Sequence, residues 1–415
     1  MTKFKAIGQY LYYIGLFLYV FSYNIQYSYA HNDWIVAQSP MLMVIKIMRY
    51  AAYLFCIIHL VSLYKINIYT ISAAIILFVA AVYATYTGPQ KAPIFYSILL
   101  ITGIKTDFRK CVKIFLFIQL TTFIIYISLS QMGISGSDVI EDQGRLRSFL
   151  GYGWVNRASY CWFFVCLEIL YLRENKLNIS LGLVLSVVNY FIYARTNTKF
   201  SMLMTFLVIG YGVLKQYRSK IFGGKRRIKL RTISRIAVFL FVLSIVVGVV
   251  LPLMYNPNNS IMAKLNRLAT GRLGLGKTAI ERYGLHLGGN KIQWVGSSTL
   301  MFGLSDGTEY FYVDNGFLQL SLEFGLLFTA FIVFIYIASI RISCKMGKCN
   351  LAMIIVILGV LFVFEPYAVD FAFNPFVLYF FSTFRNKKNN EKCLTEQINK
   401  SIMRKGYNTI NVVYK

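Results

Sequence analysis

Long apolar runs alternate with short polar segments along the whole chain. Most runs are about 15 to 25 residues long, the length that an α-helix needs to cross a bilayer, whereas barrel strands alternate over about ten residues. The pattern therefore predicts an all-α polytopic membrane protein with about twelve transmembrane helices. The predicted spans are 7–25, 43–64, 68–86, 92–104, 111–131, 153–172, 179–194, 200–214, 236–254, 314–339, 351–366 and 373–384. The fourth and twelfth are short enough to be half-helices or re-entrant segments.

Composition excludes most other protein classes. Of the 415 residues, 57% are hydrophobic and only 14% are charged, and mean hydropathy is +0.58. Such a chain lacks the polar residues that would cover a soluble surface, so we exclude soluble enzymes, secreted disulfide scaffolds and disordered proteins. The seven cysteines show no zinc or disulfide spacing. The first apolar run has no small-residue cleavage site, so no cleavable signal peptide is expected.

The net charge of +27 predicts the orientation of the chain. In a soluble protein this charge would indicate nucleic acid, but in a membrane protein Lys and Arg collect in cytoplasmic loops. Most Lys and Arg residues in the loops lie on the cytoplasmic side when both termini are placed there, so we expect both termini to be cytoplasmic. We also expect one integral membrane domain over 1–415, with membrane lipids and no nucleic acid as partners. Its main polar segments are a basic cytoplasmic loop at 215–235, a large outward loop at 255–313 between spans nine and ten, and a basic cytoplasmic tail at 385–415.

The large loop contains a misleading phosphate-loop pattern. Residues 271–278 fit G-x-x-x-x-G-K-[ST], but a true phosphate loop follows a strand. The preceding residues have helical periodicity, which continues from Ile261 to about Leu287. We therefore predict no nucleotide site, although Arg272 and Lys277 beside glycine N–H groups suit phosphate oxygens.

Arginine is unusually frequent in the segments that this topology places outside. Because arginine binds phosphate in a bidentate manner and stays charged, the set suits a diphosphate ligand; headgroup binding or pairing with nearby acids is the alternative for each member. Available carboxylates and a histidine in the same segments are candidates for a general base. The basic residues are Arg145, Arg147, Arg157, Arg195, Lys199, Arg267, Arg272 and Arg282, and the candidate bases are Glu281, His286, Asp306, Glu309 and Asp314. No D-x-D pattern or His/Cys cluster is present, so no metal is expected.

Among the charged residues inside predicted spans, four need a separate interpretation. Lys46 and Arg49 share one face of the second span, where they either point into a cavity or extend to headgroups. Glu168 and Glu323 lie in the sixth and tenth spans and have the same two interpretations.

Four motifs in this order resemble the Wzy-type repeat-unit polymerases of bacterial O-antigen, capsule and exopolysaccharide, and more distantly the O-antigen ligases. They are RSFLGYGWVNRA at 147–158, ARTNTKF at 194–200, TGR at 270–272, and YVDNGFLQL at 312–320 followed by EFG at 323–325. Two positions depart from the family pattern. Lys199 stands where the family usually has arginine, and Asp314 stands where relatives often carry histidine.

The resemblance implies a function and a location. It implies a glycosyltransferase of the bacterial cytoplasmic membrane with a fold like that of the GT-C enzymes, without metal, nucleotide sugar or other cofactor. The enzyme joins undecaprenyl-diphosphate-linked oligosaccharides on the outer face and releases undecaprenyl diphosphate. Donor and acceptor are both lipid-linked, and a chain-length regulator and a flippase are expected partners. A glycan ligase and a lipid-linked oligosaccharide flippase or transporter remain the alternatives.

The resemblance and the chemistry of the residues assign expected roles. Arg147, Arg195 and Arg272 would stabilise the diphosphate leaving group, and Asp314 would accept the proton of the acceptor hydroxyl. The expected substrate-binding residues are Arg145, Asn156, Arg157, Lys199, Lys277, Glu281, Arg282, His286 and Asn315, of which Glu281 and His286 are the alternative bases.

Overall fold

The computed structural model describes residues 2–63, 66–88, 90–142, 144–174, 176–221, 229–303 and 309–384. The predicted tail at 385–415 lies outside the described residues, as do Asp306 and part of the basic loop at 215–235.

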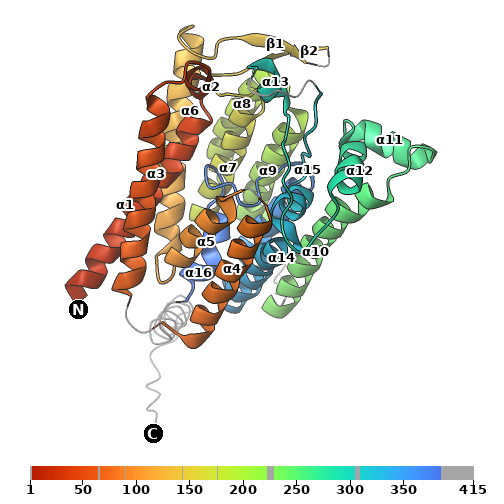
Figure 1. Cartoon of the computed structure of the whole chain (residues 1–415). Coiled ribbons are helices and arrows are strands. Elements are labelled where there is room, and N and C mark those ends of the chain that lie inside the picture. The colour runs from red at the N-terminus through yellow and green to blue at the C-terminus, as the bar shows by residue number, and fades with distance from the viewer. Residues whose placement is uncertain are drawn as a thin grey trace.

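Helices occupy the first eleven predicted spans to within a few residues (Figure 1). The twelfth span contains only a 3₁₀ turn and one helical turn, which together cover residues 376–382. The elements are α1 (Thr2–Gln26), α2 (Tyr29–Val36), α3 (Met41–Ser62), α4 (Ile68–Thr87), α5 (Ala92–Thr102), α6 (Phe108–Gln131), β1 (Val139–Asp142), β2 (Arg145–Ser148), α7 (Arg157–Leu172), α8 (Ile179–Thr196), α9 (Lys199–Ile221), α10 (Leu230–Met254), α11 (Ser260–Leu268), α12 (Arg272–Tyr283), α13 (Ser297–Met301), α14 (Gly316–Lys345), α15 (Cys349–Phe364), η1 (Phe376–Leu378) and α16 (Tyr379–Ser382).

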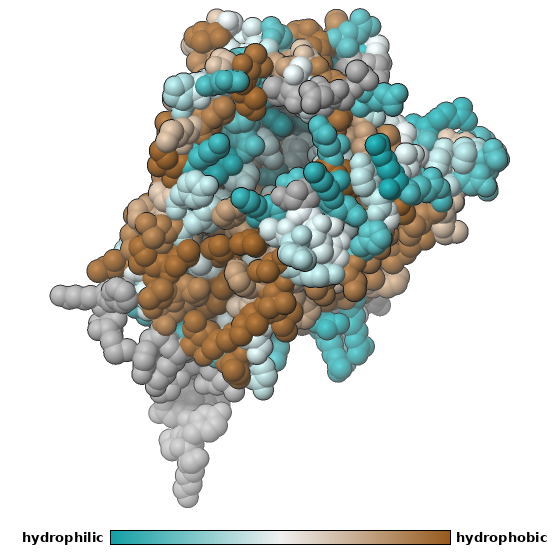
Figure 2. Space-filling model, viewed as in Figure 1, coloured by the Kyte–Doolittle hydropathy of each residue, from teal (hydrophilic) through white to brown (hydrophobic). Residues whose placement is uncertain are grey.

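Six helices in the described part of the chain are long and apolar enough to cross a membrane. They are α3, α4, α6, α8, α10 and the second part of α14, Gly325–Lys345. Their apolar side chains are exposed; on α4, for example, Ile75 and Val79 are each 57% exposed. Figure 2 shows a broad hydrophobic surface over the body of the bundle. Because so large a surface of exposed isoleucine and valine side chains is unfavourable in water, these faces fit a lipid environment and the protein is membrane-embedded.

One end of the bundle carries the extramembrane structure, and we call it the loop end. It comprises α2, the antiparallel hairpin β1–β2 and α11 to α13 (Figure 1). The hairpin was not predicted, because four-residue strands give little periodic signal. The predicted helical periodicity of 261–287 forms two helices, α11 and α12. They are separated where Thr270 and Gly271 adopt positive φ angles of 53° and 84°.

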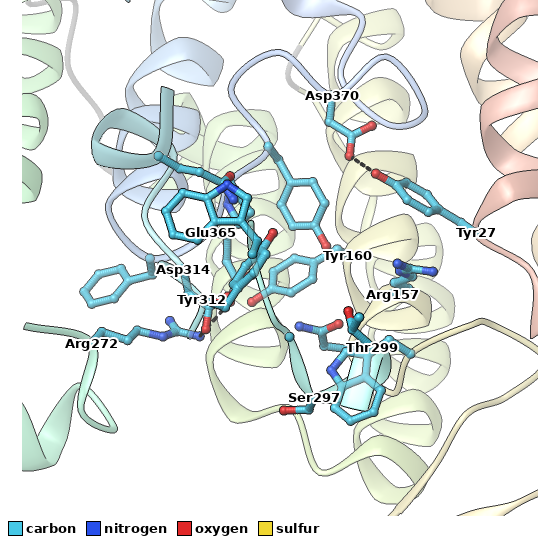
Figure 3. Close-up of a pocket in the computed structure, with 18 of the residues that line it drawn as sticks. Tyr27, Arg157, Tyr160, Arg272, Ser297, Thr299, Tyr312, Asp314, Glu365 and Asp370 are labelled. Atoms are coloured by element: carbon cyan, nitrogen blue, oxygen red, sulfur yellow. Dashed lines mark hydrogen bonds and ion pairs between the residues drawn. The ribbon is translucent and has the colours of Figure 1, made fainter. Parts of the chain in front are cut away.

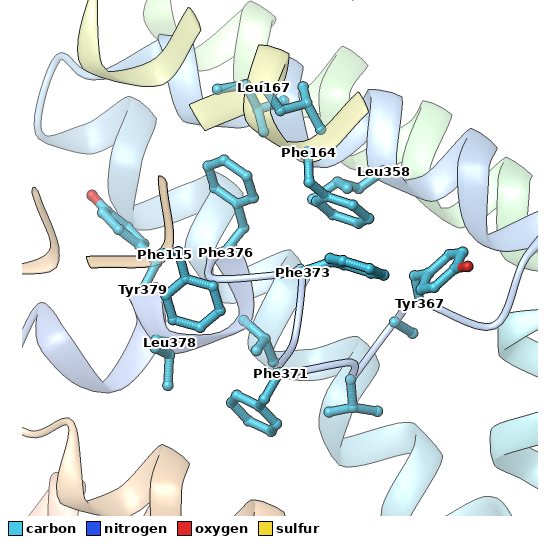
Figure 4. Close-up of a cluster of buried hydrophobic side chains, with 14 of the residues drawn as sticks. Phe115, Phe164, Leu167, Leu358, Tyr367, Phe371, Phe373, Phe376, Leu378 and Tyr379 are labelled. Carbon is cyan, nitrogen blue, oxygen red and sulfur yellow. The ribbon is translucent and has the colours of Figure 1, made fainter. Parts of the chain in front are cut away.

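The C-terminal part of the described chain runs as an irregular segment through the bundle (Figure 4). Phe373 stacks on Phe164 of α7, with ring centroids 6.0 Å apart. Twelve residues of the sixteen-residue helix α7 are buried, so this helix and the segment form the centre of the hydrophobic core. The predicted twelfth span is therefore neither a full helix nor a surface loop.

Helix α14 breaks at Gly325, where φ is 85° and ψ is 163°. The backbone of the loop segment 286–290 lies against this break and bonds the peptide groups that the helix leaves unpaired. The Leu326 N–H donates to the His286 carbonyl at 2.9 Å, and the Asn290 N–H donates to the Leu322 carbonyl at 3.1 Å. The break therefore joins the large loop rigidly to the bundle.

Replacing Gly325 with alanine should destabilise the protein. A Cβ atom there would overlap the backbone of Leu287 and Gly288, and alanine disfavours the positive φ, a strain of about 1–3 kcal/mol. Gly210 of α9 is the matched control, because a Cβ atom added there would meet no heavy atom within 4 Å. We expect Gly325→Ala to lower the melting temperature of the detergent-solubilised protein and Gly210→Ala to leave it unchanged or raise it. A Gly325→Ala protein that melts at the same temperature as wild type would contradict this account of the break.

Candidate functional site

A cavity of about 1110 Å³ lies at the loop end of the bundle. Helices α1, α3, α5, α7, α12 and α14 contribute to its walls, together with the segment that follows α15. Figure 2 shows this hollow with hydrophilic residues around its mouth. A volume of this size fits several sugar residues rather than one ion, and its polar walls set it apart from the lipid-facing surface.

Arg272, Asp314 and Glu365 form a charged cluster on one wall (Figure 3). Arg272 Nη2 lies 3.0 Å from Glu365 Oε1 and 3.5 Å from Asp314 Oδ2. Each residue stands at a helix boundary: Arg272 begins α12 after the left-handed Gly271, Asp314 precedes the N-cap of α14, and Glu365 ends α15. Three separate helix ends therefore converge on one arginine.

Burial changes the acidity of this cluster. It raises the pKa of Glu365 to about 7, although the nearby Arg272 opposes the change. The pKa of Asp314 is also raised by burial, again against Arg272. The Glu365 residue is 2% exposed, whereas the Asp314 side chain is 25% exposed and borders the cavity. The cluster thus has one accessible carboxylate and one buried carboxyl group that changes protonation near neutral pH.

A second wall joins two of the sequence motifs. Arg147 of β2 is buried, and its Nε donates to the carbonyl of Thr196 at 2.8 Å while Nη2 donates to Thr198 Oγ1 at 3.3 Å. Asn197 is left-handed, with φ of 53°, and this tight turn between α8 and α9 presents Lys199 to the cavity. The motifs at 147–158 and 194–200 therefore meet, as a shared binding site requires.

A third wall is formed by α1. Tyr23 in its last turn and Tyr27 directly after it line the cavity, and the guanidinium groups of Arg49 and Arg157 lie over their rings at 3.9 and 4.5 Å. The Tyr27 hydroxyl donates to Asp370 Oδ2 at 2.5 Å (Figure 3). Aromatic rings and hydrogen-bonding groups on the same wall are the combination that recognises sugars and their phosphate esters.

The structure brings seven of the thirteen predicted site residues to the cavity and places six elsewhere. The seven that line it are Arg145, Arg147, Asn156, Arg157, Lys199, Arg272 and Asp314. The other six are Arg195, Lys277, Glu281, Arg282, His286 and Asn315.

The six residues outside the cavity lining have local partners. Arg195 is exposed beside the Phe191 ring, and Arg282 lies over the rings of Tyr283 and Phe311. The others interact as follows: Lys277 pairs with Glu281 at 3.4 Å, and His286 Nε2 lies 3.0 Å from the Tyr283 carbonyl.

Asn315, predicted as a substrate-binding residue, does not line the cavity and instead caps a helix. Its Oδ1 accepts from the Leu318 N–H at 3.0 Å and caps α14, and its Nδ2 donates to the Gly248 carbonyl at 2.7 Å. By fixing the start of α14 against α10, it also fixes the adjacent Asp314.

The charged residues inside the predicted spans separate into two groups. Arg49 and Glu323 line the cavity, and Glu323 accepts from Trp294 Nε1 at 3.2 Å. Lys46 is exposed, and Glu168 is buried against Gln119 at 2.9 Å, so neither lines the cavity.

Sequence reasoning missed Glu365, Asp370, Tyr27 and Tyr160, all of which line the cavity. A signal for Glu365 was present, because a carboxylate at the end of an apolar run is costly unless it has a partner or a function. No comparable signal marked the tyrosines, since aromatic residues are abundant throughout the chain.

Comparison with family models, curated proteins and solved structures found no match to this chain.

Proposed function

We propose that this protein is a GT-C-like glycosyltransferase that polymerises lipid-diphosphate-linked oligosaccharide repeat units. The observation that carries the proposal is the cavity itself: it is large, lies at one end of a membrane-embedded bundle, and combines basic residues, carboxylates and aromatic rings. A lipid-linked sugar needs all three groups of contacts, because it has a charged diphosphate, an uncharged glycan and a membrane-bound tail.

The cluster of Arg272, Asp314 and Glu365 supports a specific transfer step. The acceptor sugar hydroxyl attacks the anomeric carbon of the donor glycan, and its proton passes to the Asp314 carboxylate. The new glycosidic C–O bond forms as the C–O bond to the diphosphate breaks, and the lipid diphosphate leaves with the bonding electrons. Arg272 keeps Asp314 ionised and oriented, and the basic residues of the other walls counter the charge of the leaving group.

The orientation in the membrane is part of the proposal. The loop end would face the outside of a bacterial cytoplasmic membrane, and both termini would be cytoplasmic. At the opposite end, Arg109 Nη2 donates to the Leu172 carbonyl at 2.7 Å, and Lys215 bonds to Asn350. These basic residues connect helix ends where the positive-inside rule expects them. The cavity would then receive substrates that have already crossed the membrane.

Deleting the gene tests this function. We expect the host to accumulate single lipid-linked repeat units and to lose the ladder of longer surface glycans. Wild-type protein should restore the ladder. Asp314→Asn should not, because general-base loss costs about 10²–10⁴-fold in rate. Glu174→Gln, an exposed change at the opposite end, is the matched control and should restore it.

Two other results would replace the proposal. Full-length glycan that stays on its lipid carrier would indicate a ligase. Repeat units trapped on the cytoplasmic side would indicate a flippase or transporter.

The pH dependence of polymerisation tests the role of Arg272. A general base acts when it is deprotonated, so activity should fall as pH falls through the raised pKa of Asp314. Arg272 lowers both pKa values, so Arg272→Gln should move the acidic limb of the pH–rate profile to higher pH as well as slow the reaction. Rates of ladder formation by purified protein in nanodiscs give the profile. An acidic limb at the same pH in both proteins would exclude this role.

A further inference from the structure

We propose that Arg49 and Arg157 form the binding site for the diphosphate group of the lipid-linked substrate. This inference rests on the proposed function and names the part of the cavity that holds the diphosphate. It also moves the main diphosphate contact away from Arg272, where the sequence motifs had placed it.

The geometry of the α1 wall supplies the first argument. Tyr23 lies in the last turn of α1, Tyr27 directly follows the helix, and both line the same cavity. Arg49 comes from α3 and Arg157 begins α7, yet each guanidinium lies over one of these rings, at 3.9 and 4.5 Å. Two planar, permanently charged groups therefore lie over the rings of two tyrosines that line the same cavity.

Hydrogen bonds hold Arg49 in this position. Its Nε donates to Ser22 Oγ at 3.3 Å and its Nη2 donates to Gln26 Oε1 at 2.5 Å. Both partners are neutral, so they orient the guanidinium without cancelling its charge. Within the described part of the chain no hydrogen bond engages Nη1, which is therefore available to a ligand.

Charge balance supplies the second argument. Among the described residues, no carboxylate lies within ion-pair distance of Arg49 or Arg157, and the Arg157 side chain has no hydrogen-bond acceptor there. Asp370 is near enough to act electrostatically on Arg157, but its carboxylate forms no ion pair with it and instead accepts from the Tyr27 hydroxyl at 2.5 Å and the Ala372 N–H at 2.8 Å. Arg272, in contrast, lies between two acids. An anion gains more from the pair whose charge is not already neutralised.

The location supplies the third argument. Figure 3 shows Arg157 and Tyr27 on one side of the cavity, Arg272 and Asp314 on the other, and Tyr160 between them. A diphosphate on the first side would place the attached sugar toward Asp314. The leaving group and the base would then act from different walls, as the transfer step requires.

Binding measurements on the full chain in zwitterionic nanodiscs test the proposal. The probe is farnesyl diphosphate, with farnesyl monophosphate and inorganic pyrophosphate as comparison ligands. We expect Arg49→Gln and Arg157→Gln each to raise the Kd for farnesyl diphosphate at least tenfold, and the double variant to raise it about a hundredfold, with a smaller effect on the monophosphate. Inorganic pyrophosphate should show the same dependence on the two arginines, because the site recognises the diphosphate group.

A control variant separates binding from folding. Arg231→Gln changes an exposed arginine of α10 that does not line the cavity and should bind like wild type. Melting temperatures of all variants should match wild type. Arg157→Lys keeps the charge but loses the planar fork, so its Kd should lie between those of wild type and Arg157→Gln.

Two results would overturn the inference. One is a double variant that is folded and binds farnesyl diphosphate with wild-type affinity. The other is displacement of the probe by phosphatidylglycerol at equal concentration, which would show a general site for anionic headgroups. The proposed function fails separately: if the gene deletion leaves long surface glycans intact while binding still depends on the two arginines, the diphosphate site stands and polymerisation does not.

Discussion

The fold depends on satisfying the backbone of an irregular segment that runs through the bundle. Unpaired peptide groups in such an environment cost several kcal/mol each, so they must find partners. Neighbouring side chains supply these: Asn24 Nδ2 donates to the Ala372 carbonyl and Gln119 Nε2 to the Phe373 carbonyl, both at 3.0 Å. Asn374 Nδ2 donates to the Tyr367 carbonyl at 2.9 Å. Amides from α1 and α6 thus replace the hydrogen bonds that a helix would have made.

The same segment links the walls of the cavity. Glu365, at its start, bonds to Arg272, and Asp370, five residues later, bonds to Tyr27. The segment thus places one carboxylate against the start of α12 and the other against the residue that follows α1. The two arginine environments then differ in kind: Arg272 is balanced by acids, whereas Arg49 and Arg157 rest on tyrosine rings. One suits proton transfer and the other suits anion binding.

Sequence periodicity predicted the helices well, because apolar runs of membrane length leave few alternatives. It could not predict the irregular segment at 365–375 or the break at Gly325. Both depend on partners distant in sequence, such as Asn24 and the loop at 286–290. The motif residues Arg147, Lys199 and Arg272 do meet in the cavity. Arg195 and Asn315 belong to the same motifs but do not line the cavity. Arg195 is exposed beside the Phe191 ring and Asn315 caps α14, and both placements depend on how the helices pack.

The central claim is that the cavity holds a lipid-diphosphate-linked saccharide, and native mass spectrometry tests it most directly. The protein would be purified from membranes of its own host, in a mild detergent that keeps bound lipids. We expect a bound species whose mass equals a polyprenyl diphosphate carrying one or more repeat units, and which fragments into a glycan and a lipid diphosphate. Protein that carries only phospholipids, although the same membranes contain the lipid-linked glycan, would contradict the claim.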